Sequence, residues 1–147
     1  MTLREDRIAY QHVSGFAPGL FIGDYEGAEW ALAHDAWSVL NVLEDSDTTR
    51  YGSPYRVHRP IIARGYAQPG LLNHVAGWIE AQHDLSRPTL VHCAAGLERS
   101  PLAVAWMLAR RHRWPLAKAY RMVKLPRPAI DDRTAWLPKG WEAWLRR

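Results

Sequence analysis

The sequence holds a single cysteine, Cys93, and no long apolar run. One cysteine cannot form an internal disulfide, and no spacing of Cys and His residues is typical of a zinc site. The longest uninterrupted apolar run, residues 102–109, is far shorter than the roughly 18 residues that a membrane-spanning helix needs. We therefore expect no disulfide framework, no membrane span, no metal ion and no cofactor.

Internal repeats, low-complexity tracts and linker-like stretches are absent from the sequence as well. A chain of 147 residues suits one hydrophobic core, so we expect a single domain over residues 1–147. The first residues mix charges where a signal peptide would carry an apolar stretch, which predicts a cytoplasmic protein.

The charge balance is mildly basic, with 19 Lys and Arg residues against 15 Asp and Glu residues. The basic residues are scattered and form no compact stripe with interleaved aromatic residues, so we expect no stable complex with nucleic acid. An anionic substrate that approaches a positive cleft accounts for the excess equally well.

Apolar periodicity and turn residues divide the chain into alternating strands and helices. The predicted strands are residues 20–23, 37–43, 55–62 and 89–92, with an edge strand before residue 18. The predicted helices are residues 24–34, 71–85, a helix that opens at Pro101, 116–123 and 134–145. The helix from Pro101 is apolar nearly all round, which is typical of a helix in the middle of a fold. This order predicts an α/β fold with a central, mostly parallel sheet flanked by helices.

Residues 91–101 join the last predicted strand to the apolar helix and read Val-His-Cys-Ala-Ala-Gly-Leu-Glu-Arg-Ser-Pro. The junction lies at the carboxyl end of a strand, where open α/β sheets bind ligands. Its small residues let backbone N–H groups turn inward into a concave nest, and the helix N-terminus adds unpaired donors and partial positive charge. Arg99 offers a planar fork that can hold two oxygens of one phosphate. The segment therefore predicts a phosphate-binding loop.

The only cysteine stands at the start of this loop. The positive field that attracts a phosphate also favours the thiolate of Cys93, which is the nucleophilic form. A thiolate beneath a bound phosphate predicts in-line attack and a phosphocysteine intermediate. We expect His92 to order the loop by hydrogen bonds, and Ser100 either to cap the helix or to stabilise the thiolate as it leaves the phosphocysteine. The loop is not a nucleotide P-loop, because no Gly-Lys-Ser/Thr follows Gly96.

The pattern His92-Cys93-x-x-Gly96-x-x-Arg99-Ser100 resembles the signature of the cysteine-based protein tyrosine phosphatases. Residues 19–23, 37–43 and 127–130 resemble the early strand, the second strand and the late Arg-Pro loop of the dual-specificity branch, so the resemblance covers residues 16–146. It implies the phosphatase fold with its CX5R loop, with Cys93 as the nucleophile and Arg99 as the phosphate clamp. The implied substrate-binding cradle is Ala94, Ala95, Gly96, Leu97, Glu98 and Arg99.

The sequence departs from the family at the general acid. The family carries an aspartate for this role on a loop upstream of the cysteine, but residues 60–68 contain no carboxylate. A general acid contributes about 10²- to 10⁴-fold to the rate, so the acid is either lost or relocated.

Glu98 is one candidate for the relocated acid. Myotubularin-like and Sac-type lipid phosphatases and rhodanese-fold cell-cycle phosphatases carry an acidic residue at this position, and a phosphate dianion favours the protonated form of a neighbouring carboxyl. Equally open is a salt bridge from Glu98 to a neighbouring arginine that orients the loop. Asp131 and Asp132 are the next candidates, followed by Asp45 and Asp47, although such residues more often cap a helix or face solvent.

Two classes of function remain. The first is a phosphomonoester hydrolase that acts on phosphotyrosine or another aryl phosphate of a phosphorylated protein. Arg64, Arg127 and Arg133 extend this hypothesis to more anionic substrates, namely a phosphoinositide or an RNA 5′-phosphate. The second is a phosphoprotein-binding module with little turnover, which the missing aspartate favours and the retained Cys93 and Arg99 oppose. Sulfur transfer on a rhodanese-like scaffold is disfavoured by the flanking elements.

Overall fold

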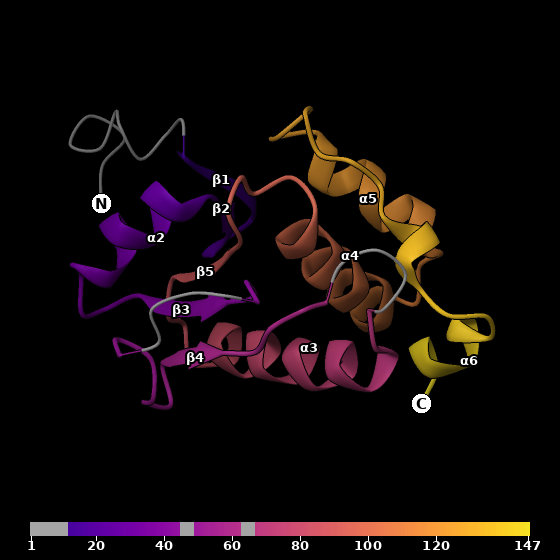
Figure 1. Ribbon diagram of the computed structural model, residues 1–147, viewed down its shortest axis with the longest axis horizontal. Coiled ribbons are helices and arrows are strands. Elements are labelled where there is room, and N and C mark those ends of the chain that lie inside the picture. Colours follow the sequence, from indigo (N-terminus) through magenta and orange to yellow (C-terminus); the bar gives the residue numbers. More distant parts are fainter. Residues whose placement is uncertain (1–11, 45–48, 63–66) are drawn as a thin grey trace.

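The computed structural model describes residues 12–44, 49–62 and 67–147. Within these residues five strands form one sheet in the order β1-β2-β5-β3-β4 (Figure 1). The strands are β1 (Val13–Ala17), β2 (Leu20–Gly23), β3 (Ser38–Asn41), β4 (Arg56–His58) and β5 (Thr89–His92). Only β1, at one edge, runs antiparallel to its neighbour in this set. The predicted α/β fold with a mostly parallel sheet is confirmed.

Helices cover both faces of the sheet (Figure 1). The helices are α2 (Tyr25–Leu32), α3 (Pro69–Asp84), α4 (Arg99–His112), α5 (Leu116–Lys124) and α6 (Trp141–Leu145). Successive side chains of a strand point to opposite faces, so Leu90 of β5 packs in a cluster with α2 whereas Val91 packs in a larger cluster with α3 to α6. The single central sheet therefore separates two apolar layers.

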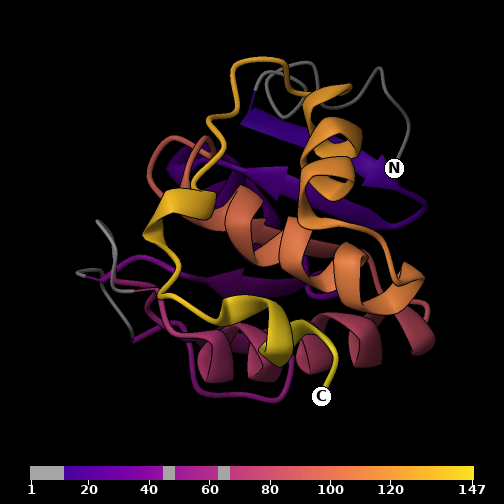
Figure 2. The same ribbon diagram turned by 90° about the vertical axis from the view of Figure 1, so that its right-hand side faces the viewer.

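Helix α4 is the centre of the larger layer. It lies between α3 and α5 (Figure 2), and every residue from Ser100 to Ala109 is buried. The apolar composition of this segment on all sides predicted that position, because no face of the helix has to meet water. Residues 93–98 join the central strand β5 to α4, so the candidate loop leads directly into the most deeply packed helix.

The chain after residue 130 differs from the prediction of one helix over residues 134–145. A 3₁₀ turn covers Thr134–Trp136, and α6 begins only at Trp141. Pro138 lacks an N–H group for a continuous helix, and Gly140 has a φ of +86°, a conformation that favours glycine. The apolar periodicity of the surrounding residues favours one helix, but Pro138 and Gly140 interrupt it.

Smaller differences concern where elements begin and end. Strand β4 ends at His58 instead of residue 62, since Pro60 cannot donate a ladder hydrogen bond. Helix α3 begins at Pro69, with proline in its first turn, and α4 begins at Arg99, two residues before the predicted start at Pro101. Among the helices described, none is both long and apolar enough to cross a membrane.

Candidate active site

The carbonyl groups of the loop between β5 and α4 turn outward. The oxygen of Ala94 accepts from the N–H of Tyr25 at 3.0 Å, and the oxygen of Leu97 accepts from the N–H of Asp131 at 2.9 Å. Between them, Arg127 donates from Nη2 to the oxygen of Ala95 and from Nε to the oxygen of Gly96, both at 3.0 Å. In a trans peptide the N–H points opposite to the C=O. Four outward carbonyls therefore direct the following amides toward the inside of the loop.

Glycine is required at the middle of this loop. Gly96 has a φ of +70°, and a Cβ atom there would come within 2.8 Å of the Gly23 backbone and 2.9 Å of Arg127 Nη2. A side chain at position 96 would therefore push the loop away from β2 and from the arginine that holds its carbonyls. The glycine permits both the turn and the close approach of two other segments.

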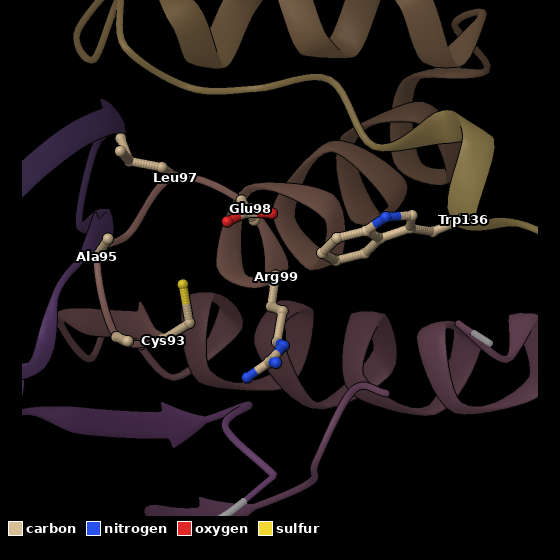
Figure 3. Close-up of a pocket in the computed structure, with 7 residues that line it drawn as sticks. Cys93, Ala95, Leu97, Glu98, Arg99 and Trp136 are labelled. Carbon is tan, nitrogen blue, oxygen red and sulfur yellow. The ribbon is translucent and has the colours of Figure 1, made fainter. Parts of the chain in front are cut away.

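The loop encloses a pocket of about 220 Å³ (Figure 3). Its lining residues are Cys93, Ala94, Ala95, Leu97, Glu98, Arg99 and Trp136. Figure 3 shows the Cys93 sulfur pointing into the enclosed space, beside the Arg99 side chain that descends from the first turn of α4. The structure thus brings together the expected nucleophile and five of the six residues of the expected cradle, all but Gly96, and adds Trp136, which sequence reasoning missed.

Ser100 supplies a polar contact to the buried sulfur. Its Oγ lies 3.2 Å from Cys93 Sγ, and only 4% of Cys93 is exposed. Ser100 is inside α4, whose N-cap position belongs to Glu98, so the capping role expected as one alternative is wrong. A hydroxyl at this distance can donate to a thiolate, which supports the other alternative.

His92 holds the start of the loop in a neutral form. Its Nδ1 faces the carbonyl oxygen of Cys93 at 3.4 Å, and its Nε2 lies 2.8 Å from the hydroxyl of Tyr51. Because a carbonyl only accepts, Nδ1 carries the proton and the Tyr51 hydroxyl donates to Nε2. Burial lowers the pKa of His92 to about 4 and raises the pKa of Tyr51 to about 12, so both stay uncharged near neutrality. These contacts support an ordering role for His92.

The carboxylate of Glu98 is bound by an arginine. Arg133 Nε and Nη2 both lie 3.0 Å from Glu98 Oε2, and Nη2 lies 3.4 Å from Asp131 Oδ2. The ion pair that the sequence left open for Glu98 is therefore present. The Arg133 guanidinium also lies over the ring of Trp136, 5.2 Å from its centroid. Arg133 is thus engaged by two carboxylates and a ring, and its contact with a more anionic substrate stays a prediction.

Two further residues from the sequence analysis lie outside the pocket. Asp132 Oδ1 accepts from the N–H and the hydroxyl of Thr134 at 2.8 and 2.6 Å, which are contacts within a local turn. Arg127 lies behind the loop, where its Nη1 also donates to Ser14 Oγ at 3.0 Å and burial lowers its pKa. Arg127 therefore shapes the loop, a role that sequence reasoning missed.

Another carboxylate, from the segment that follows β3, lies near Arg99. Glu44 Oε1 lies 3.7 Å from Arg99 Nη2, and 40% of the Glu44 side chain is exposed. Sequence reasoning missed this residue too, although its place directly after the apolar run of a predicted parallel strand was a usable signal. Arg64, Asp45 and Asp47 fall outside the described residues. In the part of the chain that the structure describes, no group of three or more His, Cys, Asp or Glu side chains is placed to hold a metal ion.

Comparisons with known proteins agree with this geometry. The family model described as dual specificity phosphatase, catalytic domain, matches residues 39–138. Human DUSP28 shares 26% identity with the chain at a TM-score of 0.66, over 90% of this chain and 92% of that one. A mouse dual specificity phosphatase complexed with zinc tungstate shares 24% (TM-score 0.69; 92% and 84% covered). The PTP-2 phosphatase of Cydia pomonella shares 16% (TM-score 0.72; 86% and 86%). No curated protein matches the chain.

Proposed function

The chain belongs to the dual specificity phosphatase family, and from that premise we propose that it hydrolyses phosphomonoesters through a phosphocysteine intermediate on Cys93. The observation that carries the proposal is the loop whose four consecutive carbonyls are held on the outside by Tyr25, Arg127 and Asp131. The inward amides and the amino end of α4 then meet above the sulfur, where a tetrahedral dianion would be stabilised.

The first chemical step transfers the phosphoryl group to sulfur. The Cys93 thiolate attacks phosphorus, and the S–P bond forms as the bond to the leaving oxygen breaks on the opposite side. The loop amides and the Arg99 fork hold the three equatorial oxygens, and preorganised donors of this kind are each worth about 10²- to 10³-fold in rate. The leaving oxygen takes up a proton as it departs.

The second step releases the phosphate. Water attacks phosphorus, the S–P bond breaks, and inorganic phosphate leaves while the thiolate is restored. The Ser100 hydroxyl, 3.2 Å from the sulfur, donates to the thiolate as it departs and so lowers the energy of this leaving group.

We propose phosphotyrosine or another aryl phosphate of a phosphorylated protein as the substrate. The supporting observation is the apolar part of the pocket wall, to which Leu97 and the Trp136 ring contribute beside the loop. An aromatic ring can pack against such a wall. The role of Glu98 or Asp131 as the proton donor stays a prediction. Both carboxylates form ion pairs with Arg133, which favours a role in anchoring the loop instead. The contact from Arg64 to the substrate also stays a prediction.

The test replaces the nucleophile. Cys93→Ser should still bind phosphate or tungstate but should release no 4-nitrophenol from 4-nitrophenyl phosphate, with a loss on the order of 10⁴-fold or more in kcat, because the covalent path is gone. Rapid quenching of the wild type with radiolabelled substrate should trap phosphate on Cys93. Comparable turnover by the variant would eliminate the covalent mechanism. A wild type that binds a phosphotyrosyl peptide but turns over no phosphoester would establish the binding module instead.

A further inference from the structure

We propose that the ring of Trp136 selects aryl phosphates over alkyl phosphates, and that the ion pair between Glu98 and Arg133 holds this ring at the pocket. The inference rests on the proposed function and names a specificity-determining residue for it. Among the described residues that line the pocket with Cys93, Trp136 is the one with an aromatic ring. It reaches the pocket from the 3₁₀ turn Thr134–Trp136, which lies outside the phosphate-binding loop.

The Trp136 ring forms the part of the pocket wall that the loop does not supply. Figure 3 shows the ring extending from its own segment toward Glu98 and Arg99. A phosphoryl group held by the loop amides and Arg99 lies over the sulfur, and in-line attack requires its substituent on the side away from the sulfur. The substituent then occupies the rest of the pocket, whose wall includes Trp136. An aryl ring can pack against this ring in an offset or edge-to-face arrangement, whereas an alkyl chain offers no ring for the contact.

The backbone that carries this ring is tied to the loop and to the core. The N–H of Asp131 donates to the oxygen of Leu97 in the loop at 2.9 Å. The N–H of Arg133 donates to the hydroxyl of Tyr120 at 3.1 Å, and Tyr120 is buried in α5. Leu137, directly after the turn, is buried as well. The turn is therefore fixed on both sides, so its ring is presented to the pocket from a defined position.

The Arg133 side chain connects the ring to the loop. Its guanidinium lies over the Trp136 ring, 5.2 Å from the centroid, which is within the range of a cation–π attraction. Its Nε and Nη2 each lie 3.0 Å from Glu98 Oε2. Because Glu98 belongs to the loop, one guanidinium contacts a loop residue and the ring together. This arrangement restricts the rotamers that the ring can adopt at the pocket.

The same ion pair offsets an unfavourable charge in the pocket wall. Glu98 lines the pocket, and a carboxylate in that position repels a phosphate dianion. Arg133 places a positive charge within hydrogen-bond distance of the carboxylate, so the pair as a whole adds no net charge to the site. Glu98 and Arg133 therefore have a use in substrate selection that requires no proton transfer.

The experiment compares the binding of two phosphonates that the protein cannot hydrolyse. Benzylphosphonate carries a CH₂ group in place of the ester oxygen of phenyl phosphate, and methylphosphonate lacks the ring. In Trp136→Leu the Kd of benzylphosphonate, measured by titration calorimetry, should rise by about 3- to 10-fold, because the contact between two rings is lost. The Kd of methylphosphonate should stay within about twofold of the wild type, since the loop and Arg99 are unchanged. Trp136→Phe keeps a ring and should retain most of the preference for benzylphosphonate.

The matched control is Trp144→Leu. The Trp144 ring also lies beneath an arginine, with the guanidinium of Arg147 3.8 Å from its centroid, and it also packs against the core. Trp144 is not part of the pocket lining. This variant should therefore bind both phosphonates as the wild type does.

The ion pair is tested by the double variant Glu98→Gln/Arg133→Met, which removes both charges together. The Kd of benzylphosphonate should rise by about 3-fold while that of methylphosphonate is unchanged, because the ring is no longer held at the pocket. Adding Trp136→Leu to the double variant should give the same Kd as Trp136→Leu alone, since the ion pair acts through the ring. Additive losses would overturn the positioning role of Glu98 and Arg133.

The outcomes separate this inference from the proposed function, because phosphonate binding requires no turnover. An equal rise in both Kd values in Trp136→Leu would show that the residue only supports the loop and would overturn the inference. An unchanged Kd for benzylphosphonate would also overturn it, since the ring would then make no contact with the substrate. If quenched wild type carries no phosphate on Cys93 but Trp136→Leu loses affinity for benzylphosphonate alone, the phosphocysteine reaction is refuted and the role of Trp136 in selection is supported.

Discussion

The two ends of helix α4 meet the rest of the molecule in opposite ways. At the amino end, residues 93–99 surround a pocket, and the carbonyls of the loop are bound from outside while its amides face inward. The unpaired donors of a helix start and its partial positive charge are thus directed at a space that a ligand can fill.

The carboxyl end of α4 also borders a pocket, but there the carbonyls and side chains of the helix bind other parts of the chain. The oxygen of Ala109 accepts from the N–H of Trp114 at 3.1 Å and from Arg146 Nη1 at 3.3 Å, and Arg110 Nη1 donates to Asn73 Oδ1 and to the oxygen of Trp144. Positive side chains suit the negative end of a helix. The dipole of α4 therefore favours anion binding at the amino end and stabilises the fold at the carboxyl end. Substitutions at the amino end should mainly change the reaction rate, whereas substitutions at the carboxyl end should mainly change the free energy of unfolding.

The largest expected effect is on the rate, at the amino end. Arg99→Lys should lower kcat/KM on 4-nitrophenyl phosphate by about 10²- to 10³-fold, because a point charge cannot replace a planar fork. Its free energy of unfolding should change by less than about 1 kcal/mol, since the half-buried Arg99 side chain faces the pocket. Arg111→Lys is the control, because Arg111 makes a similar carboxylate contact at 3.8 Å far from the loop.

The proposed difference between the two ends of α4 would be contradicted if Arg111→Lys slowed the reaction as much as Arg99→Lys does. It would also break if Arg99→Lys kept wild-type kcat/KM, since the guanidinium would then have no special part in holding the phosphoryl group.

The next effect is a pH dependence of stability at the amino end. The unfolded chain protonates His92 near pH 6.5, whereas burial lowers its pKa in the folded state to about 4. Between these values the unfolded state binds more protons, so the free energy of unfolding should fall as pH falls, by up to about 1.4 kcal/mol per pH unit. Urea unfolding of wild type and His92→Asn should show a stability gap that is widest above pH 6.5 and narrows toward pH 4. A gap that stays constant would contradict a neutral, buried His92.

The smallest expected effect is on stability at the carboxyl end. Arg110→Met should lower the free energy of unfolding by about 2 kcal/mol, because hydrogen bonds from a charged donor to Asn73 and Trp144 are lost. Its kcat/KM should stay within about twofold of the wild type when measured well below the unfolding temperature. Arg113→Met is the control, since Arg113 is exposed. If Arg110→Met lost activity but kept its free energy of unfolding, the proposed difference between the two ends of α4 would be contradicted.

The sequence predicted best where local pattern alone decides the structure. The run Thr89–His92 holds the apolar pair Leu90 and Val91, begins after Pro88 and ends before small residues, and the strand occupies those same four positions. The phosphate-binding loop from Cys93 to Arg99 could be predicted equally well, because its glycine spacing, its helix start and its residue types all lie within one short segment. Local signals agree there, which is typical of well-specified structure.

The sequence predicted least where the site depends on segments far apart in the chain. Glu44, Tyr51 and Trp136 reach the loop or its flanking strand only because β3 lies beside β5 and because the chain after α5 returns to the pocket. No local sequence pattern determines the order of the strands in a sheet. The charge of Arg127 similarly suggested a position near an anion. Its hydrogen bonds to two loop carbonyls could not be predicted, because they depend on the orientation of the peptide groups in the loop.

The burial of α4 has a consequence for how the amide hydrogens of the protein exchange with deuterium. Segments whose packing surrounds them on all sides release their amides only when the whole domain opens, whereas exposed ends open by themselves. The amides from Leu102 to Ala109 should therefore be among the slowest to take up deuterium. The reactive loop is joined to that slow segment, so the helix that anchors one end of the loop stays formed for as long as the domain itself does.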